Sequence, residues 1–287
     1  MNDMLPIAPL PDIVIEPLVR LALAEDFGRS GDITTDAVIP GSRRMRAVID
    51  ARERGIAAGY DAARLALRLV DPDVVWTTLT EEGSAFEKGA DLVRIEGSAR
   101  SILMAERVML NFIGPLSGIA TLTSMFVAET AGTKARITCT RKTTPGFRSL
   151  EKRAVRLGGG TNHRLGLDDA ILIKDNHIAA AGGVARALGR ARAAVGHLRA
   201  IEIEVDRLDQ IHEALPFEPD AILLDNMSTA LLKEAVALIA GRAKTEASGG
   251  VRLDTVKAIA ATGVDFISAG ALTHSAVNLD VGLDYQG

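Results

Sequence analysis

Short apolar runs alternate with amphipathic stretches from about residue 133 to the end of the chain. The runs that have the length of strands are ARITC, DAILI, RAIEIEV, AILLD, AKTEAS and DFISAG. Each is followed by a stretch in which apolar residues recur at helical spacing, as in TALLKEAVALIAG. Such alternation predicts parallel β/α units. The predicted strands are fewer than a complete barrel requires, so the pattern predicts an incomplete β/α barrel or a doubly wound sheet.

The first part of the chain has a mixed pattern. IEPLVRLALAED predicts a helix, GRSGDITTDAVIP a loop, and DAARLALRLV a second helix. The strand-like segments are MRAVIDA, GIAAG, VVWTTL and DLVRIEG. These elements predict a small α+β unit. A long helical pattern over residues 101–130 follows, and Pro115 inside it predicts two helices or a kink.

Polar residues recur where the predicted barrel strands end. They are Arg141 and Lys142, Lys174, Asp225 and Asn226, and the segments 248–250 and 268–270. Active sites of barrels lie at the carboxyl ends of the strands, and the last loops often bind phosphate, so this placement favours the barrel. Glu202 and Glu204 alternate within one strand and therefore point to the same side.

Positive charge is concentrated between residues 140 and 177. The whole chain is acidic, with a formal net charge of −4 and a pI near 5.8. The local cations are Arg141, Lys142, Arg148, Lys152, Arg153, Arg156, Arg164 and Lys174, with His163 and His177. Local cations beside glycine-rich segments predict a small ligand that carries several negative charges. The four cations of the LEKRAVRLG region, residues 148–156, are instead predicted to form a solvated or interface face.

Composition excludes several classes of protein. Overall acidity argues against nucleic-acid binding, and the one cysteine, Cys139, favours a reducing compartment. The N-terminal residues lack a basic region before an apolar core, and no uncharged apolar run has membrane-spanning length. No Cys/His spacing resembles a zinc site, and no nucleotide-binding glycine motif is complete. We therefore expect a cytoplasmic protein that binds neither membranes nor nucleic acid.

Several motifs together resemble one known family. They are TRKTTPGFR, RLGGGTNHRLGL, ILIKDNH, IEIEV, ILLDN and SGGV. The chain resembles quinolinate phosphoribosyltransferases over nearly its whole length. The resemblance implies an α/β fold, with an N-terminal α/β sandwich over residues 1–115 and an open β/α barrel over 116–273. The tail 274–287 is expected to pack back on the first domain.

The resemblance also implies a reaction and a set of site residues. Quinolinate and 5-phosphoribosyl 1-diphosphate would give nicotinate mononucleotide, diphosphate and CO2 in NAD synthesis. The catalytic residues would be Lys142, Lys174, Glu204 and Asp225. The implied substrate-binding set adds Arg107, Thr140, Arg141, His163, Arg164, Ser248, Gly249, Gly250, Ser268, Ala269 and Gly270.

Within that set the resemblance implies separate roles. Arg141, His163, Arg164 and Lys174 would line the quinolinate pocket, and the loops of 248–250 and 268–270 would hold the 5-phosphate. Glu204 and Asp225 would hold ribose hydroxyls or Mg2+, and no organic cofactor is expected. Arg107 would reach into the site of a partner subunit, so that a homodimer is the functional unit.

Three alternatives share parts of this pattern. They are a homologue associated with molybdate transport, a non-catalytic protein that binds an anionic metabolite, and a barrel enzyme that forms a Schiff base through Lys174. Arg107, Arg141, His163 and Arg164 together favour quinolinate over the first alternative. Glu204 and Asp225 argue against the second, because simple anion binding does not need carboxylates.

Overall fold

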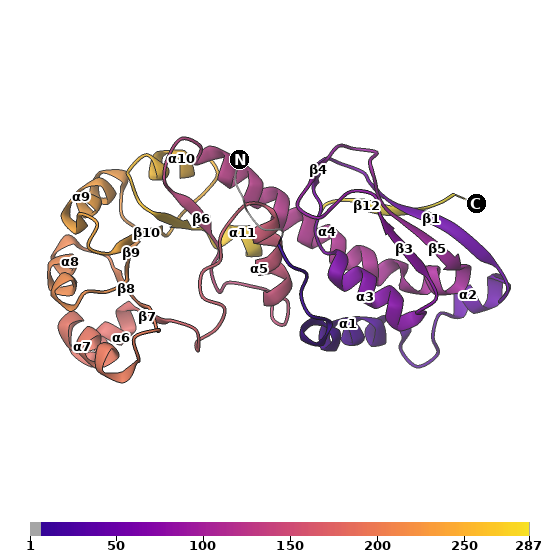
Figure 1. Ribbon diagram of the computed structural model, residues 1–287, viewed down its shortest axis with the longest axis horizontal. Helices are drawn as coiled ribbons and strands as arrows, with labels where there is room; N and C mark the ends of the chain where they lie inside the picture. The colour runs from indigo at the N-terminus through magenta and orange to yellow at the C-terminus, as the bar shows by residue number, and fades with distance from the viewer. Residues whose placement is uncertain (1–6, 287) are drawn as a thin grey trace. The chain divides into compact units, whose positions relative to one another are not determined.

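The structure is a computed structural model that describes residues 7–286. The expected absence of a signal peptide depends partly on residues 1–6, which lie outside the described residues. The chain forms two compact units (Figure 1). The first comprises Met1–Ser124, Thr143–Gly159 and Ser275–Gly287, and the second comprises Met125–Lys142 and Gly160–His274.

The first unit contains a four-stranded antiparallel sheet in the order β12-β1-β5-β3. Its strands are β1 (Arg44–Ala51), β3 (Val75–Thr78), β5 (Asp91–Ser98) and β12 (Val281–Tyr285), and a small second sheet pairs β2 (Gly55–Ile56) with β4 (Ala85–Phe86). The sequence pattern did not predict β12. Its pairing with β1 places the C-terminal segment at the edge of this sheet.

Helices complete the first unit. They are α1 (Asp12–Phe27), α2 (Ile33–Val38), α3 (Tyr60–Val70), α5 (Arg148–Leu157) and the longer α4 (Ala99–Glu129), whose last residues belong to the second unit. The prediction of a loop over residues 28–40 is wrong at α2. The side chain of Asp32 accepts a hydrogen bond from the Thr35 backbone N–H at 2.9 Å, and this N-cap begins the helix.

Helix α4 continues through Pro115, so the expected pair of helices is wrong. Proline removes one N–H from the helix and leaves the carbonyl of Asn111 without its usual partner. Asn111 is exposed, and water can satisfy that carbonyl. By length and composition alone, α4 could cross a membrane, contrary to the sequence expectation, but 61% of its most apolar window is buried inside the structure. That burial is typical of a core helix.

The second unit is an open parallel β/α barrel, as predicted. Its strand order is β6-β11-β10-β9-β8-β7, and the edge strands β6 and β7 do not pair with each other. The strands are β6 (Arg136–Thr138), β7 (Ile171–Ile173), β8 (Ile201–Val205), β9 (Ala221–Asp225), β10 (Lys244–Ser248) and β11 (Phe266–Ser268). The helical elements are α6 (Asp175–Ala181), α7 (Val184–Ala194), α8 (Leu208–Ala214), η1 (Leu215–Phe217), α9 (Thr229–Ile239), α10 (Val256–Ala260) and α11 (Ala271–His274). Figure 1 shows α7, α8 and α9 on the outer side of the curved sheet.

Strand β8 shows how the sequence divides the two faces of this sheet. Ile201, Ile203 and Val205 are at most 2% exposed and alternate with Glu202 and Glu204. Because side chains alternate along a strand, the apolar residues face the helices and the acidic residues face the barrel interior. The interior of the barrel is therefore polar near the carboxyl ends of its strands.

A buried ion-pair network anchors α5 within the first unit. The guanidinium of Arg153 lies 3.1 Å from the Asp61 carboxylate and 2.8 Å from the Glu82 carboxylate. Burial raises the pKa of Glu82, although the charge of Arg153 opposes the shift. Of the expected solvated or interface face, the solvated alternative is thus wrong for Arg153, whose side chain is only 9% exposed, and for Lys152, which is 2% exposed.

We predict that Arg153→Ala lowers the free energy of unfolding by about 3–5 kcal/mol, because it leaves two buried carboxylates without their cation. Arg156→Ala, on the exposed side of the same helix, is the matched control and should cost less than about 0.5 kcal/mol. Urea denaturation of both variants measures the difference. Equal midpoints would show that the network contributes nothing to stability.

Candidate active site

A cavity of about 590 Å³ opens at the carboxyl ends of the barrel strands. The predicted site residues that line it are Thr140, Arg141, Lys142, His163, Arg164, Lys174, Glu204, Asp225, Ser248, Gly249, Gly250 and Ser268. The segments that carry them are separated by up to 128 residues in the sequence (140 to 268) but converge on one cavity. The open barrel therefore assembles the cations, acids and small residues that were predicted at separate strand ends.

The Arg164 guanidinium is fixed in the pocket wall with part of its hydrogen-bonding capacity unused. Its Nη1 donates to the Ala170 carbonyl at 3.1 Å, whereas its buried Nε has no hydrogen-bond partner among the described residues. Burial, and then the charge of Arg141, lower the pKa of Arg164. Two neighbouring cations and an unsatisfied buried donor suit an anionic ligand.

Two side-chain hydroxyls hold the backbone of the segment after β6. The Lys142 N–H donates to the Thr140 hydroxyl at 3.0 Å, and the Thr273 hydroxyl donates to the Lys142 carbonyl at 2.7 Å. A Cβ at Gly270 would lie 3.1 Å from Cδ of Lys142. The small residue at this position therefore leaves room for the lysine side chain.

Two carboxylates sit at the ends of adjacent strands. The Lys174 ammonium lies 3.0 Å from the Glu204 carboxylate, and the Asn226 side-chain amide donates to the Asp225 carboxylate at 2.7 Å. The Glu204 side chain is 14% exposed and Lys174 is 48% exposed, so this pair is only partly screened by water. The arrangement offers carboxylate oxygens and an ammonium group to the same cavity.

The glycine loop after β10 packs directly against the end of β9. The Asn226 N–H donates to the Ser248 carbonyl at 2.9 Å, and Gly249 has a φ of +92°. A Cβ at Gly249 would clash with the Asn226 side chain and lie 2.9 Å from its backbone nitrogen. Only glycine meets both requirements at this position.

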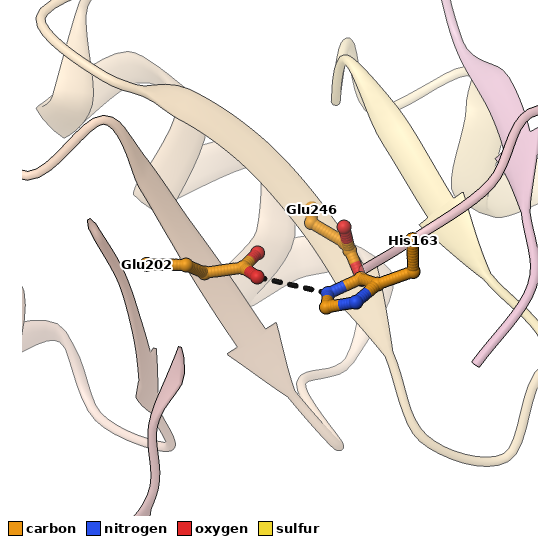
Figure 2. Close-up of side chains that lie close together, drawn as sticks. All are labelled: His163, Glu202 and Glu246. Carbon is orange, nitrogen blue, oxygen red and sulfur yellow. Dashed lines mark hydrogen bonds and ion pairs between the residues drawn. The ribbon is translucent and has the colours of Figure 1, made fainter. Parts of the chain in front are cut away.

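A second cluster, which we call the His163 cluster, lies at the same cavity and consists of His163, Glu202 and Glu246 (Figure 2). Nε2 of His163 lies 2.9 Å from the Glu202 carboxylate and 3.8 Å from Oε1 of Glu246. Thr161, two residues before His163, forms a bridge with Thr138 at the free edge of β6. This bridge brings the imidazole into the barrel.

The hydrogen bonds of the imidazole argue against a metal ion in the His163 cluster. Nδ1 of His163 accepts the backbone N–H of Arg164 at 2.8 Å, so the hydrogen-bond network assigns the ring proton to Nε2. A protonated Nε2 donates to Glu202 and has no lone pair for a metal. The three groups lie within 4.8 Å of one another, yet their arrangement fits a proton-sharing cluster better than a ligand set.

Glu246 is the residue of this cluster whose protonation is most perturbed. Burial, and then the nearby charge of Glu202, raise the pKa of the Glu246 carboxyl to about 7, against the opposing influence of His163 and of a hydrogen bond from Ser268. Its Oε1 is buried and has no hydrogen-bond partner among the described residues. The cavity therefore contains a carboxyl group that holds a proton near neutral pH.

Comparison with known proteins identifies the architecture. Residues 32–117 match the N-terminal domain of quinolinate phosphoribosyl transferase, and residues 119–284 match the C-terminal domain of the same family. The chain belongs to the quinolinate phosphoribosyl transferase family. The family assignment accounts for both units and for the convergence of the motifs on one cavity.

Individual relatives agree with the family assignment. The chain is 46% identical over 271 residues to a nicotinate-nucleotide pyrophosphorylase [carboxylating] of Mycobacterium leprae, covering 93% of this chain and 95% of the relative. It is 41% identical over 294 residues to a chloroplastic protein of the same name from Arabidopsis thaliana, covering 95% and 83%. The solved nicotinate-nucleotide pyrophosphorylase of Francisella tularensis superposes with a TM-score of 0.93 at 39% identity, covering 99% of this chain and 100% of the other.

Three residues implied by the family resemblance are not among those that line the cavity. Ala269 is buried, Gly270 packs near Lys142, and Arg107 is exposed on α4 in the first unit. Conversely, sequence reasoning missed Leu172, Leu223 and Glu246, and it placed Asn226 at a strand end without giving it a role in the site. Glu246 lies two residues before Ser248 on the predicted strand AKTEAS, and strand alternation alone could have placed it on the same face.

We predict that Gly249→Ala destabilises the protein more than Gly250→Ala does. Both glycines have positive φ, which costs a substituted alanine about 1–2 kcal/mol, but the Cβ at Gly250 meets open space. The added clash at Gly249 must displace Asn226. Thermal unfolding and hydrogen exchange at Asn226 measure both effects, and equal destabilisation by the two variants would contradict the close packing.

Proposed function

We propose that this chain transfers a phosphoribosyl group from 5-phosphoribosyl 1-diphosphate to quinolinate and releases diphosphate and CO2. The product is nicotinate mononucleotide, a precursor of NAD. The observation that carries the proposal is the cavity itself, where the unsatisfied Nε of Arg164 lies beside further cations and two strand-end carboxylates. Family membership supports the same reaction.

The cations account for quinolinate. This ligand carries two carboxylates, and an arginine can grip a carboxylate through two parallel hydrogen bonds, whereas a lysine acts as a point charge. We assign the quinolinate carboxylates to Arg141, Arg164 and Lys174, with His163 beside them. Leu172 and Leu223 also line the cavity and offer apolar surface to the pyridine ring.

The small residues of the cavity account for the sugar phosphate. We assign the 5-phosphate to the loops at 248–250 and 268–270, where small residues allow backbone N–H groups to approach an anion. Glu204 and Asp225 would hold the ribose hydroxyls, and Lys142 would contact the diphosphate. Thr140 supports Lys142, because its side-chain hydroxyl accepts the Lys142 backbone N–H.

The two carboxylates also fit a magnesium ion that arrives with the diphosphate substrate. Mg2+ prefers oxygen ligands and commonly combines one or two carboxylates with substrate phosphates. Glu204 and Asp225 both line the cavity and offer carboxylate oxygens to it. The ion would neutralise part of the diphosphate charge.

The chain's own residues act chiefly by positioning and by fixed charge. The pyridine nitrogen must meet the ribose C1 as the diphosphate leaves, and holding two anionic substrates together supplies much of the rate. Lys142 and Lys174 stabilise the charge that develops on the departing diphosphate. After alkylation the ring nitrogen is cationic and accepts the electron pair left by CO2, so no enzyme nucleophile is required.

The coupled assay of quinolinate loss and CO2 release tests this function directly. We expect turnover only when quinolinate, 5-phosphoribosyl 1-diphosphate and Mg2+ are all present, and we expect EDTA to abolish it. Omission of each component in turn is the control. Turnover that persists without the diphosphate substrate, or no turnover by folded protein with all three, would contradict the proposal.

We also propose that the working unit is a homodimer to which Arg107 contributes across the interface. Arg107 is exposed on α4 and is outside the set that lines the cavity of its own chain. Quinolinate is better neutralised when a further cation joins Arg141 and Arg164. The cytoplasm stays the predicted location.

The shared site predicts complementation between two inactive variants. Arg107→Ala and Lys174→Ala should each lose most activity while remaining dimeric. After mixing under conditions that allow subunit exchange, a heterodimer has one site with neither substitution, so about a quarter of wild-type activity should return if exchange is random. Size-exclusion chromatography confirms assembly. If exchanged mixtures stay inactive, Arg107 does not act in trans.

A further inference from the structure

Glu246 is a buried acid at the cavity to which none of the roles above applies. It lies on β10 two residues before Ser248, so both side chains are on the inner face of the barrel, with Glu246 farther from the open end. The residue is 5% exposed, yet it lines the cavity. Its Oε1 is buried without a hydrogen-bond partner among the described residues. A buried polar atom in this position calls for a partner.

Among residues 7–286, no lysine or arginine forms an ion pair with Glu246. From β8, the Glu202 carboxylate lies within 4.8 Å of the Glu246 carboxyl, and it accepts the Nε2–H of His163 at 2.9 Å. The same Nε2 is 3.8 Å from Oε1 of Glu246, which is too far for a hydrogen bond. In Figure 2 both carboxyl groups point toward the imidazole, but the dashed line joins only Glu202 to it.

The other described residues around Glu246 do not compensate its negative charge. On β11 the Ser268 hydroxyl interacts with Glu246, and on β9 the residue directly paired with it is Leu223. Asp225 lies two residues farther along β9, at the strand end. The cations Arg141 and Arg164 line the same cavity, where the proposed ligand carboxylates would engage them. An ionised Glu246 would therefore repel Glu202 and any dianion in the pocket.

We propose that Glu246 binds the pyridine dicarboxylate as a neutral acid, donating its O–H to a ligand carboxylate, so that ligand binding is linked to proton uptake. This inference rests on the proposed function, because it assigns Glu246 to the quinolinate side of the same cavity. A neutral carboxyl removes the repulsion and satisfies the otherwise unpartnered Oε1. The ligand carboxylate gains one hydrogen bond beyond those of the arginines.

The direction of the pH dependence follows from the raised pKa of Glu246. Burial raises this pKa to about 7, so the free protein holds the proton below that pH and loses it above. Affinity should be nearly constant in the acidic range and fall up to about tenfold for each pH unit above the pKa. A bound dianion raises the pKa again, so the protein takes up a proton as it binds above pH 7.

Calorimetric titration of the full chain with quinolinate tests the linkage. Titrations at pH 6.5, 7.5 and 8.5, about one unit apart and in buffers of different ionisation enthalpy, give both the Kd and the number of protons taken up. We expect uptake approaching about one proton at pH 8.5 and a Kd roughly tenfold weaker than at pH 7.5. In the steady state, the KM for quinolinate should rise with pH through the same range while kcat stays nearly constant.

Glu246→Gln separates this role from a merely structural one. The amide N–H2 mimics the donor of the protonated acid and cannot ionise, so the variant should take up no proton through this group and lose the alkaline weakening of Kd. Glu213→Gln, on the exposed surface of α8 and outside the cavity, is the matched control and should behave as wild type. Glu246→Ala should bind more weakly at every pH, because it lacks the donor.

The outcomes are distinct from those of the proposed function. Wild-type protein that turns over quinolinate with no proton uptake and a flat Kd overturns the neutral-acid role alone. The same conclusion follows if Glu246→Gln keeps the full wild-type pH dependence. Protein that neither binds nor turns over quinolinate at any pH overturns the proposed function, and this inference with it. The number of protons that the wild-type protein takes up on binding quinolinate tests the neutral-acid role even if a variant fails to fold.

Discussion

Each acidic side chain inside the barrel needs a cation or a proton, and the site depends on how that need is met. Glu202, Glu204 and Glu246 come from two strands of the parallel sheet and face a partly dry interior. A buried carboxylate without compensation is costly, so each acid constrains its neighbours. Glu204 holds Lys174, Glu202 holds His163, and Glu246 holds a proton.

The open edge of the sheet makes this arrangement possible. In a closed barrel a further strand would pair with β6, whereas here only Thr161 forms a bridge to Thr138 at that edge. The residues that follow Thr138 and Thr161 lie outside the strands of the sheet, and they carry Thr140–Lys142 and His163–Arg164 into the cavity. Incomplete closure thus supplies the loop residues that a pocket for a multiply charged ligand requires.

The sequence predicts the six barrel strands well, because each is a short apolar run followed by a helical pattern. It also predicts the strand-end residues, because parallel strands end at one edge of the sheet. Local propensity does not predict β12, whose pairing partner lies more than two hundred residues earlier. The His163 cluster escaped detection for the same reason, since its three residues come from three separate segments and form no spacing motif.

Lys152 and Arg153, the two buried cations of α5, show that a local pattern can also predict the wrong environment. Charged residues at helical spacing normally indicate a solvated face, but Arg153 meets acids from distant parts of the same unit and is buried with them. The pattern of residue types predicts which face of a helix is exposed. Burial of an ion pair depends instead on tertiary partners that the pattern does not contain.

In the proposed reaction this cavity recognises two neighbouring carboxylates on a pyridine ring. The most direct measurement is the ratio of kcat/KM for quinolinate to that for nicotinate, which lacks one carboxylate, with the phosphoribosyl donor at saturation. Arg141, Arg164 and the proton of Glu246 would lose a partner with nicotinate, and the account predicts a ratio of at least about a hundred. Comparable values for the two substrates would contradict it.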